Sequence, residues 1–353
     1  MKKILLFLLL LPVTINAYGA SATSAILMDT DSGRIIYQKD IHNVRSVASI
    51  SKIMTAIVAI ESGKLDEIVI IGDEINSAYG SGIYIKVGEE LTLRDLVYGL
   101  MLRSGNDAAL AIAHFVGGSV DNFVNLMNNQ AKQIGMTQTT FNNPSGLDQE
   151  KGNYSTAYDM ALLTKYAMQN PEFKTIVGTK KYELKTNLNY YLWNNKNKLL
   201  TTYKYATGGK TGFTTKAKRT LVTTASRNNV NLVAVTLNDG NDFEDHKNLF
   251  EEAFNEYRGY KILSKGKVKI LGENYYKDSE FYLNEDFYYA MKKEELNNIL
   301  IKFELQKNSN YTNNDVVGKV YVYLKEEKIY ENKVYIKKVS KKNVIKKVLG
   351  YLW

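Results

Sequence analysis

The chain has 353 residues, enough for about two domains, and its 44% hydrophobic and 24% charged content is typical of a folded globular protein. It has no cysteine, which excludes disulfides, thiolate metal sites and a cysteine nucleophile. Most of the net charge of +9 lies in residues 261–353 and the rest at Lys2 and Lys3, so residues 20–260 are close to neutral.

Residues 1–19 have the features of a secretory signal. Two lysines precede the apolar run Ile4–Leu11, which is too short to span a bilayer, and small residues follow near position 19. We therefore expect the mature protein to be exported and to act at the outer face of the cytoplasmic membrane. Export argues against nucleic acid as the partner of the basic C-terminal part and favours an anionic membrane surface.

The next predicted elements are a β-hairpin over residues 25–37 and a helix over Ser49–Gly63. Ser49 and Lys52 are three residues apart, so they share one face of that helix. A lysine whose pKa is lowered by burial and nearby positive charge can take the proton of a serine hydroxyl. The pair is therefore a candidate nucleophile and base, although Ser-x-x-Lys is a weak pattern and its second copy, Ser264–Lys267, is interpreted as chance.

Three further helices are predicted over residues 92–102, 108–116 and 119–135, and the first opens on a capping box at Thr92. The tripeptide Ser104-Gly105-Asn106 joins the first two helices. A short polar segment held between helices can point side chains into a cleft, although a simple linking turn would look the same. Residues 142–148 form a loop by composition, and another helix is predicted over residues 154–168.

Residues 179–209 have the pattern of strands and loops, and Lys210-Thr211-Gly212-Phe213 follows them. Strands are predicted over residues 220–225 and 230–237, and a helix over residues 243–257 closes the first domain. Lys210 and Thr211 could bind a carboxylate by charge and hydrogen bonding, while Gly212 would let a substrate approach closely. The alternative is a loop that leads into a strand.

The C-terminal part has a different pattern. Alternating apolar residues up to about residue 339 predict a small all-β domain, which we interpret as a spacer rather than a ligand-binding sheet. Residues 340–353 place apolar side chains on one side of a helix and lysines on the other, which is typical of a helix lying in a membrane interface. The alternative is a helix docked on its own β domain.

The three histidines give no support to a metal site or a Ser-His-Asp triad. His42 and His246 lie in polar stretches and are expected at the surface, and His114 falls within a predicted helix. We therefore predict that the protein uses no metal and no cofactor.

The Ser-Lys pair, Ser-x-Asn and Lys-Thr-Gly are each weak signals, but together and in this order they satisfy the needs of acyl transfer. Ser104 could relay a proton, and Asn106 could hold a substrate peptide or orient Lys52. The N–H of Ser49, with one from an edge strand opposite, could stabilise an oxyanion. The combination is typical of penicillin-binding proteins and class A β-lactamases.

With these motifs, the chain resembles the low-molecular-mass penicillin-binding proteins that are serine-type D-alanyl-D-alanine carboxypeptidases. Segments 143–148 and 154–161, the β domain and the amphipathic tail share in the resemblance. The last two distinguish the family from β-lactamases, as does Gly105, where class A enzymes usually have Asp. The resemblance implies an α+β transpeptidase-like fold, an antiparallel sheet flanked by helices, with a catalytic domain over residues 20–260, a β domain over 261–339 and a membrane-anchoring helix over 340–353.

The resemblance also implies the reaction. Ser49 would attack the peptide bond between the two D-alanines of the peptidoglycan stem pentapeptide, and β-lactams would acylate the same serine. Lys52 resembles the family's general base, and Ser104 and Asn106 resemble its second motif.

The same resemblance assigns the substrate-binding groups. Lys210 and Thr211 would hold the terminal carboxylate beside Gly212, and the backbone N–H of Phe213 would complete the oxyanion hole. Some members carry an arginine near that carboxylate where this chain has Leu188, so we expect recognition to depend more heavily on Lys210 and Thr211.

Three other functions remain open at this point: a D,D-endopeptidase, a β-lactamase on the same fold, and a wall-binding protein with an inactive relic of the site. Shorter endopeptidase relatives generally lack the β domain and the tail. The presence of every motif residue argues against a relic.

Overall fold

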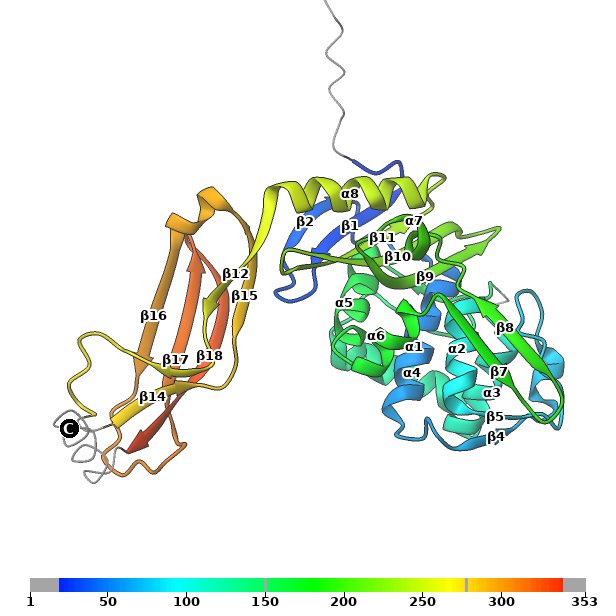
Figure 1. The fold of residues 1–353 in the computed structure, drawn as a ribbon, viewed down its shortest axis with the longest axis horizontal. Helices are drawn as coiled ribbons and strands as arrows, with labels where there is room; N and C mark the ends of the chain where they lie inside the picture. Colours follow the sequence, from blue (N-terminus) through cyan, green and yellow to red (C-terminus); the bar gives the residue numbers. More distant parts are fainter. Residues whose placement is uncertain (1–18, 149–150, 277–278, 339–353) are drawn as a thin grey trace, which may run out of the picture.

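The structure is a computed structural model that describes residues 19–148, 151–276 and 279–338. The predicted tail helix over residues 340–353 and nearly all of the predicted signal lie outside the described residues. No helix within the described ranges combines the length and the hydropathy needed to cross a membrane. Figure 1 shows two lobes, of which the larger holds the sheet and helices and the smaller is built of strands.

The larger lobe is organised around a five-stranded antiparallel sheet in the order β2-β1-β11-β10-β9. Its strands are β1 (Ser24–Asp29), β2 (Ile35–Lys39), β9 (Ala206–Thr214), β10 (Lys218–Arg227) and β11 (Val230–Leu237). The predicted hairpin is confirmed as β1 and β2. The Lys-Thr-Gly segment lies inside β9 rather than in a loop ahead of a strand, and β9 is an edge strand.

Both faces of this sheet are covered. Along β1, Ile26 and Met28 pack into the helical core, while Ala25 and Leu27 pack into the cluster beneath α8 (Asp242–Glu256), as the alternation of side chains in a strand requires. The helix α5 (Ala157–Ala167) lies against the other face (Figure 1). The edge strand β9 lies next to the helical part of the lobe, where it contacts α6 (Pro171–Gly178).

The helical part surrounds α1 (Lys52–Glu61), which is almost entirely buried because its apolar residues face every direction. It contacts α5 and the helices α2 (Leu93–Arg103), α3 (Asn106–Gly117), α4 (Val120–Ile134) and α6 (Pro171–Gly178). The predicted capping box of α2 is confirmed, since Thr92 and Asp95 bond to each other's backbone N–H groups. The side chains of Ser119 and Thr156 cap α4 and α5 by accepting bonds from the backbone N–H groups of Asn122 and Asp159.

Shorter elements complete the larger lobe. They are β3 (Arg45–Ser46), η1 (Ala48–Ser51), β4 (Ile68–Ile70), η2 (Asp73–Ser77), β5 (Glu90–Thr92), β6 (Tyr154–Ser155), β7 (Lys181–Lys185), β8 (Tyr190–Asn194) and α7 (Leu199–Thr202).

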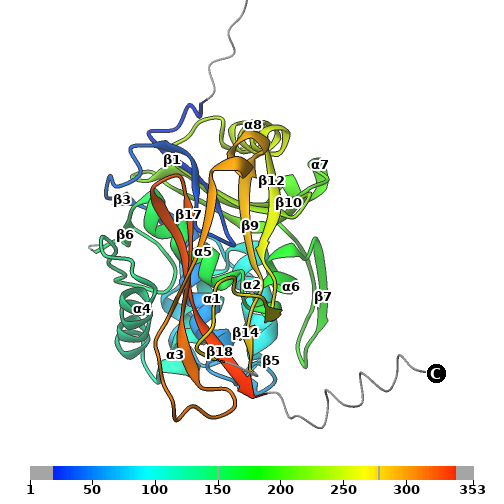
Figure 2. The same cartoon turned by 90° about the vertical axis from the view of Figure 1, so that its left-hand side faces the viewer.

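The smaller lobe is all-β apart from the short turn η3 (Lys293–Asn298), as predicted. Its elements are β12 (Tyr257–Leu263), β13 (Gly266–Val268), β14 (Ser279–Leu283), β15 (Phe287–Lys292), β16 (Ile299–Leu305), β17 (Val316–Leu324) and β18 (Glu327–Lys338). Five of them form a sheet in the order β13-β14-β18-β17-β16, and β12 pairs with β15. Figures 1 and 2 show β12 continuing directly from α8 into this lobe.

Two ion pairs join the lobes within the described residues, and one of them links Lys292 in β15 to Glu256 at the end of α8 at 2.5 Å. Arg34, in the turn between β1 and β2, donates to Glu295 at 2.7 Å and to the carbonyl of Ala290 at 2.9 Å. The domain boundary near residue 260 stays a prediction.

The surface position expected for His246 is wrong. The side chain is completely buried in α8, with Nδ1 2.5 Å from the hydroxyl of Thr223 and Nε2 3.0 Å from that of Thr236. Burial lowers the pKa of His246 to about 3, so the ring is neutral. His42 is exposed, as expected.

Candidate active site

A cleft of about 420 Å³ lies where β9 faces the helical part of the larger lobe. Residues from all three sequence motifs line it together with others that no motif marks. They are Ser49, Ser81, Ser104, Lys196, Thr211, Gly212, Phe213, Arg219, Asp242 and Phe243.

The Ser-Lys pair sits at the junction of η1 and α1. The prediction that Ser49 belongs to the α-helix is wrong in detail, because Ala48 has a φ of 50° and Ser49 lies in a 3-10 turn before the helix begins at Lys52. The two side chains nevertheless meet, with Lys52 Nζ 3.1 Å from Ser49 Oγ.

The Lys52 side chain is fully buried, and its amine makes hydrogen bonds to other groups besides Ser49. Its Nζ also contacts Asn106 Oδ1 at 2.7 Å and the carbonyl oxygen of Ser145. Burial is the main reason that its pKa falls to about 7; the charge of Lys196 lowers it further and Asp107 opposes the shift. Near neutral pH Lys52 can therefore lose its proton and offer an uncharged amine that accepts a proton from Ser49.

The second motif is built by the connection between α2 and α3. Ser104 ends α2 in the left-handed conformation, with φ of 65°, and is nearly buried in the cleft wall. Asn106 starts α3, and its Nδ2 donates to the carbonyl of Tyr79 at 2.6 Å. This bond fixes the side-chain amide so that its Oδ1 faces Lys52. Asn106 is therefore placed to orient the lysine.

A loop that sequence reasoning recognised by its composition and by the family resemblance, without assigning it a role, supplies another partner of Lys52. Asn143 Oδ1 accepts bonds from the N–H groups of Ser145 and Gly146, at 3.2 and 2.7 Å. Gly146 has φ of 78°, and a Cβ there would collide with the carbonyl of Ala48. The tight turn thereby places the Ser145 carbonyl against Lys52.

The third motif faces the Ser-Lys pair from β9. A Cβ on Gly212 would collide with Thr220 Oγ1 and lie 3.0 Å from the backbone nitrogen of Ser49, so glycine lets β9 approach η1 this closely. Thr220, opposite Gly212 in β10, donates to the carbonyl of Val47 at 3.0 Å and ties the sheet to η1. Phe213 follows with its side chain 65% exposed, so the position places little demand on residue type.

Lys210 is the second fully buried amine. Its Nζ donates to the carbonyl of Thr211 at 2.7 Å. Burial, followed by the charges of Lys52 and Lys196, holds its pKa well below the ordinary value. A carboxylate bound beside it would favour the charged ammonium form.

Two basic residues in the cleft were missed by sequence reasoning. Arg219 lies opposite Phe213 in β10, and its Nε donates to Asp242 at 3.1 Å. Lys196, between β8 and α7, has its Nζ 3.3 Å from Ser81 Oγ. No local motif marks either residue, although strand pairing would have placed Arg219 beside Phe213. Leu188 does not line the cleft; it is 52% exposed in the turn between β7 and β8.

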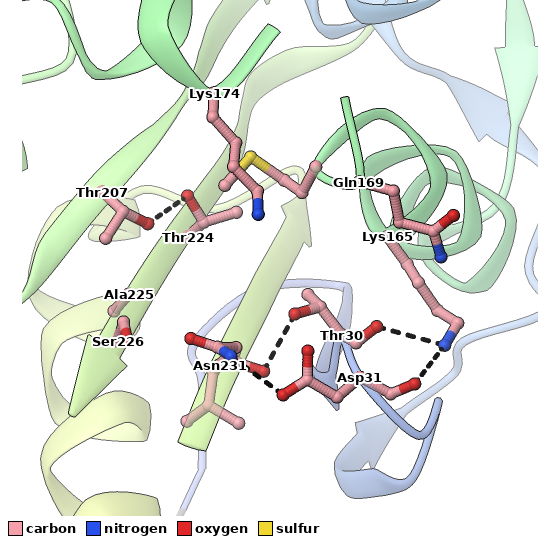
Figure 3. A pocket seen from close by; sticks show the side chains of 12 residues that line it. Thr30, Asp31, Lys165, Gln169, Lys174, Thr207, Thr224, Ala225, Ser226 and Asn231 are labelled. Carbon is pink, nitrogen blue, oxygen red and sulfur yellow. Dashed lines mark hydrogen bonds between the residues drawn. The ribbon is translucent and has the colours of Figure 1, made fainter. Parts of the chain in front are cut away.

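A second cavity, of about 400 Å³, lies at the other end of β9, between the sheet and the C-terminal end of α5 (Figure 3). Its polar groups largely satisfy one another. Thr207 donates to Thr224 at 2.8 Å, and Lys165 donates to the carbonyls of Thr30 and Asp31 at 3.1 and 2.9 Å. It contains no residue of the three motifs.

Comparisons with known proteins agree with this geometry. The family model described as D-alanyl-D-alanine carboxypeptidase matches residues 13–241, and the one described as penicillin-binding protein 5, C-terminal domain, matches residues 257–343. The chain is 34% identical over 262 residues to D-alanyl-D-alanine carboxypeptidase DacF of Bacillus subtilis, covering 70% of this chain and 67% of that protein. It is 29% identical over 337 residues to DacA of Escherichia coli, covering 87% of this chain and 81% of that protein.

Among solved structures, penicillin-binding protein 5 from Haemophilus influenzae superposes with a TM-score of 0.78 at 28% identity. The match covers 91% of this chain and 98% of that one, so it includes both lobes. With the Ser-Lys pair at the cleft, the edge strand and the second lobe in place, the chain belongs to the peptidase S11 family of serine-type D-alanyl-D-alanine carboxypeptidases, the low-molecular-mass penicillin-binding proteins.

Proposed function

We propose that Ser49 is the nucleophile of this carboxypeptidase and that Lys52 is the base that activates it. The observation that carries the proposal is the 3.1 Å approach of Lys52 Nζ to Ser49 Oγ, made by an amine whose burial lowers its pKa to about 7. A general base is most effective when its pKa lies near the working pH. No histidine lines the cleft, so none of the lining residues offers an imidazole for this role.

In the proposed reaction, Ser49 Oγ attacks the carbonyl carbon of the penultimate D-alanine of a stem pentapeptide while Lys52 accepts the hydroxyl proton. The C–N bond then breaks as Ser104 donates its hydroxyl proton to the departing amine of the terminal D-alanine, and Lys52 passes the proton taken from Ser49 to Ser104. Water then attacks the ester and gives up a proton to the neutral Lys52, which transfers it to Ser49 Oγ as the ester bond breaks and the shortened peptide leaves. A β-lactam would form the same ester by opening its ring, and its slow hydrolysis would block the enzyme.

The oxyanion of each tetrahedral intermediate would accept bonds from the N–H groups of Ser49 and Phe213. The close approach of Gly212 to the backbone of Ser49 supports this assignment because it brings the edge strand and η1 together. The terminal carboxylate would be held by Lys210 and Thr211. Asn106 would keep Lys52 aligned through its 2.7 Å contact.

The cellular setting is also a proposal. Residues 1–19 would direct export, and residues 340–353 would hold the protein on the outer face of the cytoplasmic membrane beside its peptidoglycan substrate. The β domain, residues 261–339, would then act as a spacer between the membrane and the catalytic domain, residues 20–260.

Mass spectrometry of the mature protein after incubation with benzylpenicillin tests the nucleophile. We expect a stable adduct on the peptide that contains Ser49, none in Ser49→Ala, and release of D-alanine from a pentapeptide by the unmodified enzyme. A stable adduct on another residue would refute the assignment. Rapid turnover without an adduct would indicate a β-lactamase, and neither adduct nor turnover would indicate an inactive site.

A further inference from the structure

The cleft contains an arginine that the proposed reaction does not use. Arg219 lies in β10 directly opposite Phe213 of β9. Two positions further along the pair, Leu221 lies opposite Thr211. Residues directly opposite each other in an antiparallel pair point to the same face, and so do residues two apart in one strand. Arg219, Phe213 and Thr211 therefore share one face of the sheet, and all three line the cleft.

A buried carboxylate holds the Arg219 side chain in place. Asp242, the first residue of α8, is only 4% exposed and accepts hydrogen bonds from Arg219 Nε, at 3.1 Å, and from Arg219 Nη2. The backbone N–H of Phe243 donates to the same carboxylate at 2.8 Å. The guanidinium is therefore held in one orientation, although 47% of the Arg219 side chain remains exposed.

The guanidinium keeps donors that the protein does not use. An arginine has five N–H donors, stays charged in proteins, and matches the two oxygens of a carboxylate with its planar fork. Asp242 takes the N–H of Nε and one N–H of Nη2, and within the described residues the guanidinium makes no other hydrogen bond. Nη1 and the second N–H of Nη2 can therefore bind an anionic group in the cleft.

We propose that Arg219 is a substrate-binding residue that, together with Thr211, holds the terminal carboxylate of the peptide. The inference rests on the proposed function, which places this carboxylate at Lys210 and Thr211, and it adds a residue to that site. Side chains that are diagonal neighbours across an antiparallel pair lie about 7–8 Å apart, within reach of a long side chain. A carboxylate bound to Thr211 would therefore lie within reach of Arg219.

Two lysines near the same site are placed differently. Lys210 alternates with Thr211 along β9, so it points to the opposite face of the sheet, where its buried Nζ donates to the Thr211 carbonyl at 2.7 Å. The Nζ of Lys196 lies 3.3 Å from Ser81 Oγ and comes from a loop outside the sheet. Of these three cations, Arg219 alone shares the face of the Thr211 side chain.

The test compares two N-acetylated pentapeptides that differ only at the C-terminus, one ending in the free carboxylate of D-Ala-D-Ala and the other in its carboxamide. For the full-length protein and each variant, kcat/KM is measured for the release of D-alanine and of D-alaninamide. Arg219→Gln removes the charge, and Arg219→Lys keeps the charge without the fork. Lys218→Gln removes a matched charge from an exposed neighbour on the same strand, and Lys196→Gln removes the competing cation.

We expect the unmodified protein to prefer the free carboxylate. Arg219→Gln should lower kcat/KM for that peptide by about tenfold or more, mainly by raising KM, because charge-assisted hydrogen bonds to the carboxylate are lost. The kcat/KM for the carboxamide should not change. Arg219→Lys should retain part of the preference, and Lys218→Gln and Lys196→Gln should retain all of it. Because Arg219→Gln leaves the buried Asp242 unpaired, the double variant with Asp242→Asn is also measured and should lose the preference to the same extent.

Three results would overturn the inference. An equal loss for both peptides in Arg219→Gln and in the double variant would mean that Arg219 supports the fold. An unchanged preference in both variants, or no preference in the unmodified protein, would mean that Arg219 does not hold the carboxylate. Loss of the preference in Lys196→Gln alone would place the carboxylate at the loop. If the unmodified protein cleaves neither peptide, the proposed function itself fails, and labelling of Ser49 by benzylpenicillin tests that function separately.

Discussion

The buried His246 makes a prediction about stability that can be worked out from the structure. The ring links α8 to the two strands β10 and β11 through the hydroxyls of Thr223 and Thr236. Its pKa falls from 6.5 to about 3 because burial disfavours the imidazolium. When the chain unfolds, the ring regains its ordinary pKa and takes up a proton at pH values where the folded protein cannot.

The sign follows from this difference. The neutral ring's contribution is fully present above pH 6.5 and is lost as the pH falls from 6.5 toward 3, since the unfolded state alone binds the proton there. Each pH unit in that window lowers the free energy of unfolding by about 1.4 kcal/mol. Between pH 8 and pH 5 the loss from this one residue is therefore about 2 kcal/mol.

Urea unfolding between pH 5 and pH 8 measures the effect, followed by the fluorescence of Trp193 in the larger lobe. His246→Gln cannot take up a proton, so its free energy of unfolding should depend on pH less steeply, by about 2 kcal/mol over this range. The exposed His114, changed to Gln, controls for the loss of an imidazole elsewhere. Equal pH dependence in the unmodified protein and in His246→Gln would refute the reasoning.

Three further predictions concern the cleft. The acylation rate of the unmodified protein should rise with pH through about 7 and then level off, since only neutral Lys52 accepts the proton; a rate that falls with pH over this range would exclude a lysine base. Gly212→Ala should lower acylation by at least about tenfold, because its Cβ would collide with Thr220 Oγ1, lie 3.0 Å from Ser49 N and push β9 away from the oxyanion site; normal acylation with an intact fold would show that the strand can shift without harm. Lys210→Ala should abolish D-alanine release from a pentapeptide, and intact release would end the idea that carboxylate recognition depends on Lys210 and Thr211.

Local patterns predicted most of the elements around the site. The hairpin, the capping box at Thr92 and the helix stop near Gly135 each depend on a few neighbouring residues, and each is confirmed. The errors have a different origin. The residues next to His246 in the sequence are polar, but the fold places its side chain on the buried face of α8, in line with Leu249 and Phe250 and against the sheet.

The same distinction applies to the cleft. The order of the motifs was enough to indicate the chemistry and to nominate Ser49 and Lys52, because acyl transfer requires those residue types whatever the fold around them. Arg219 and Lys196 could not be found in this way, since neither stands in a motif and each reaches the cleft through strand pairing or a loop contact. Only the tertiary structure shows that the Lys52 amine is enclosed and held by Ser49, Asn106 and Ser145. The sequence alone therefore determined the kind of reaction. The fold decided the lowered pKa of Lys52, because that pKa depends on desolvation and on charges that are distant in the chain.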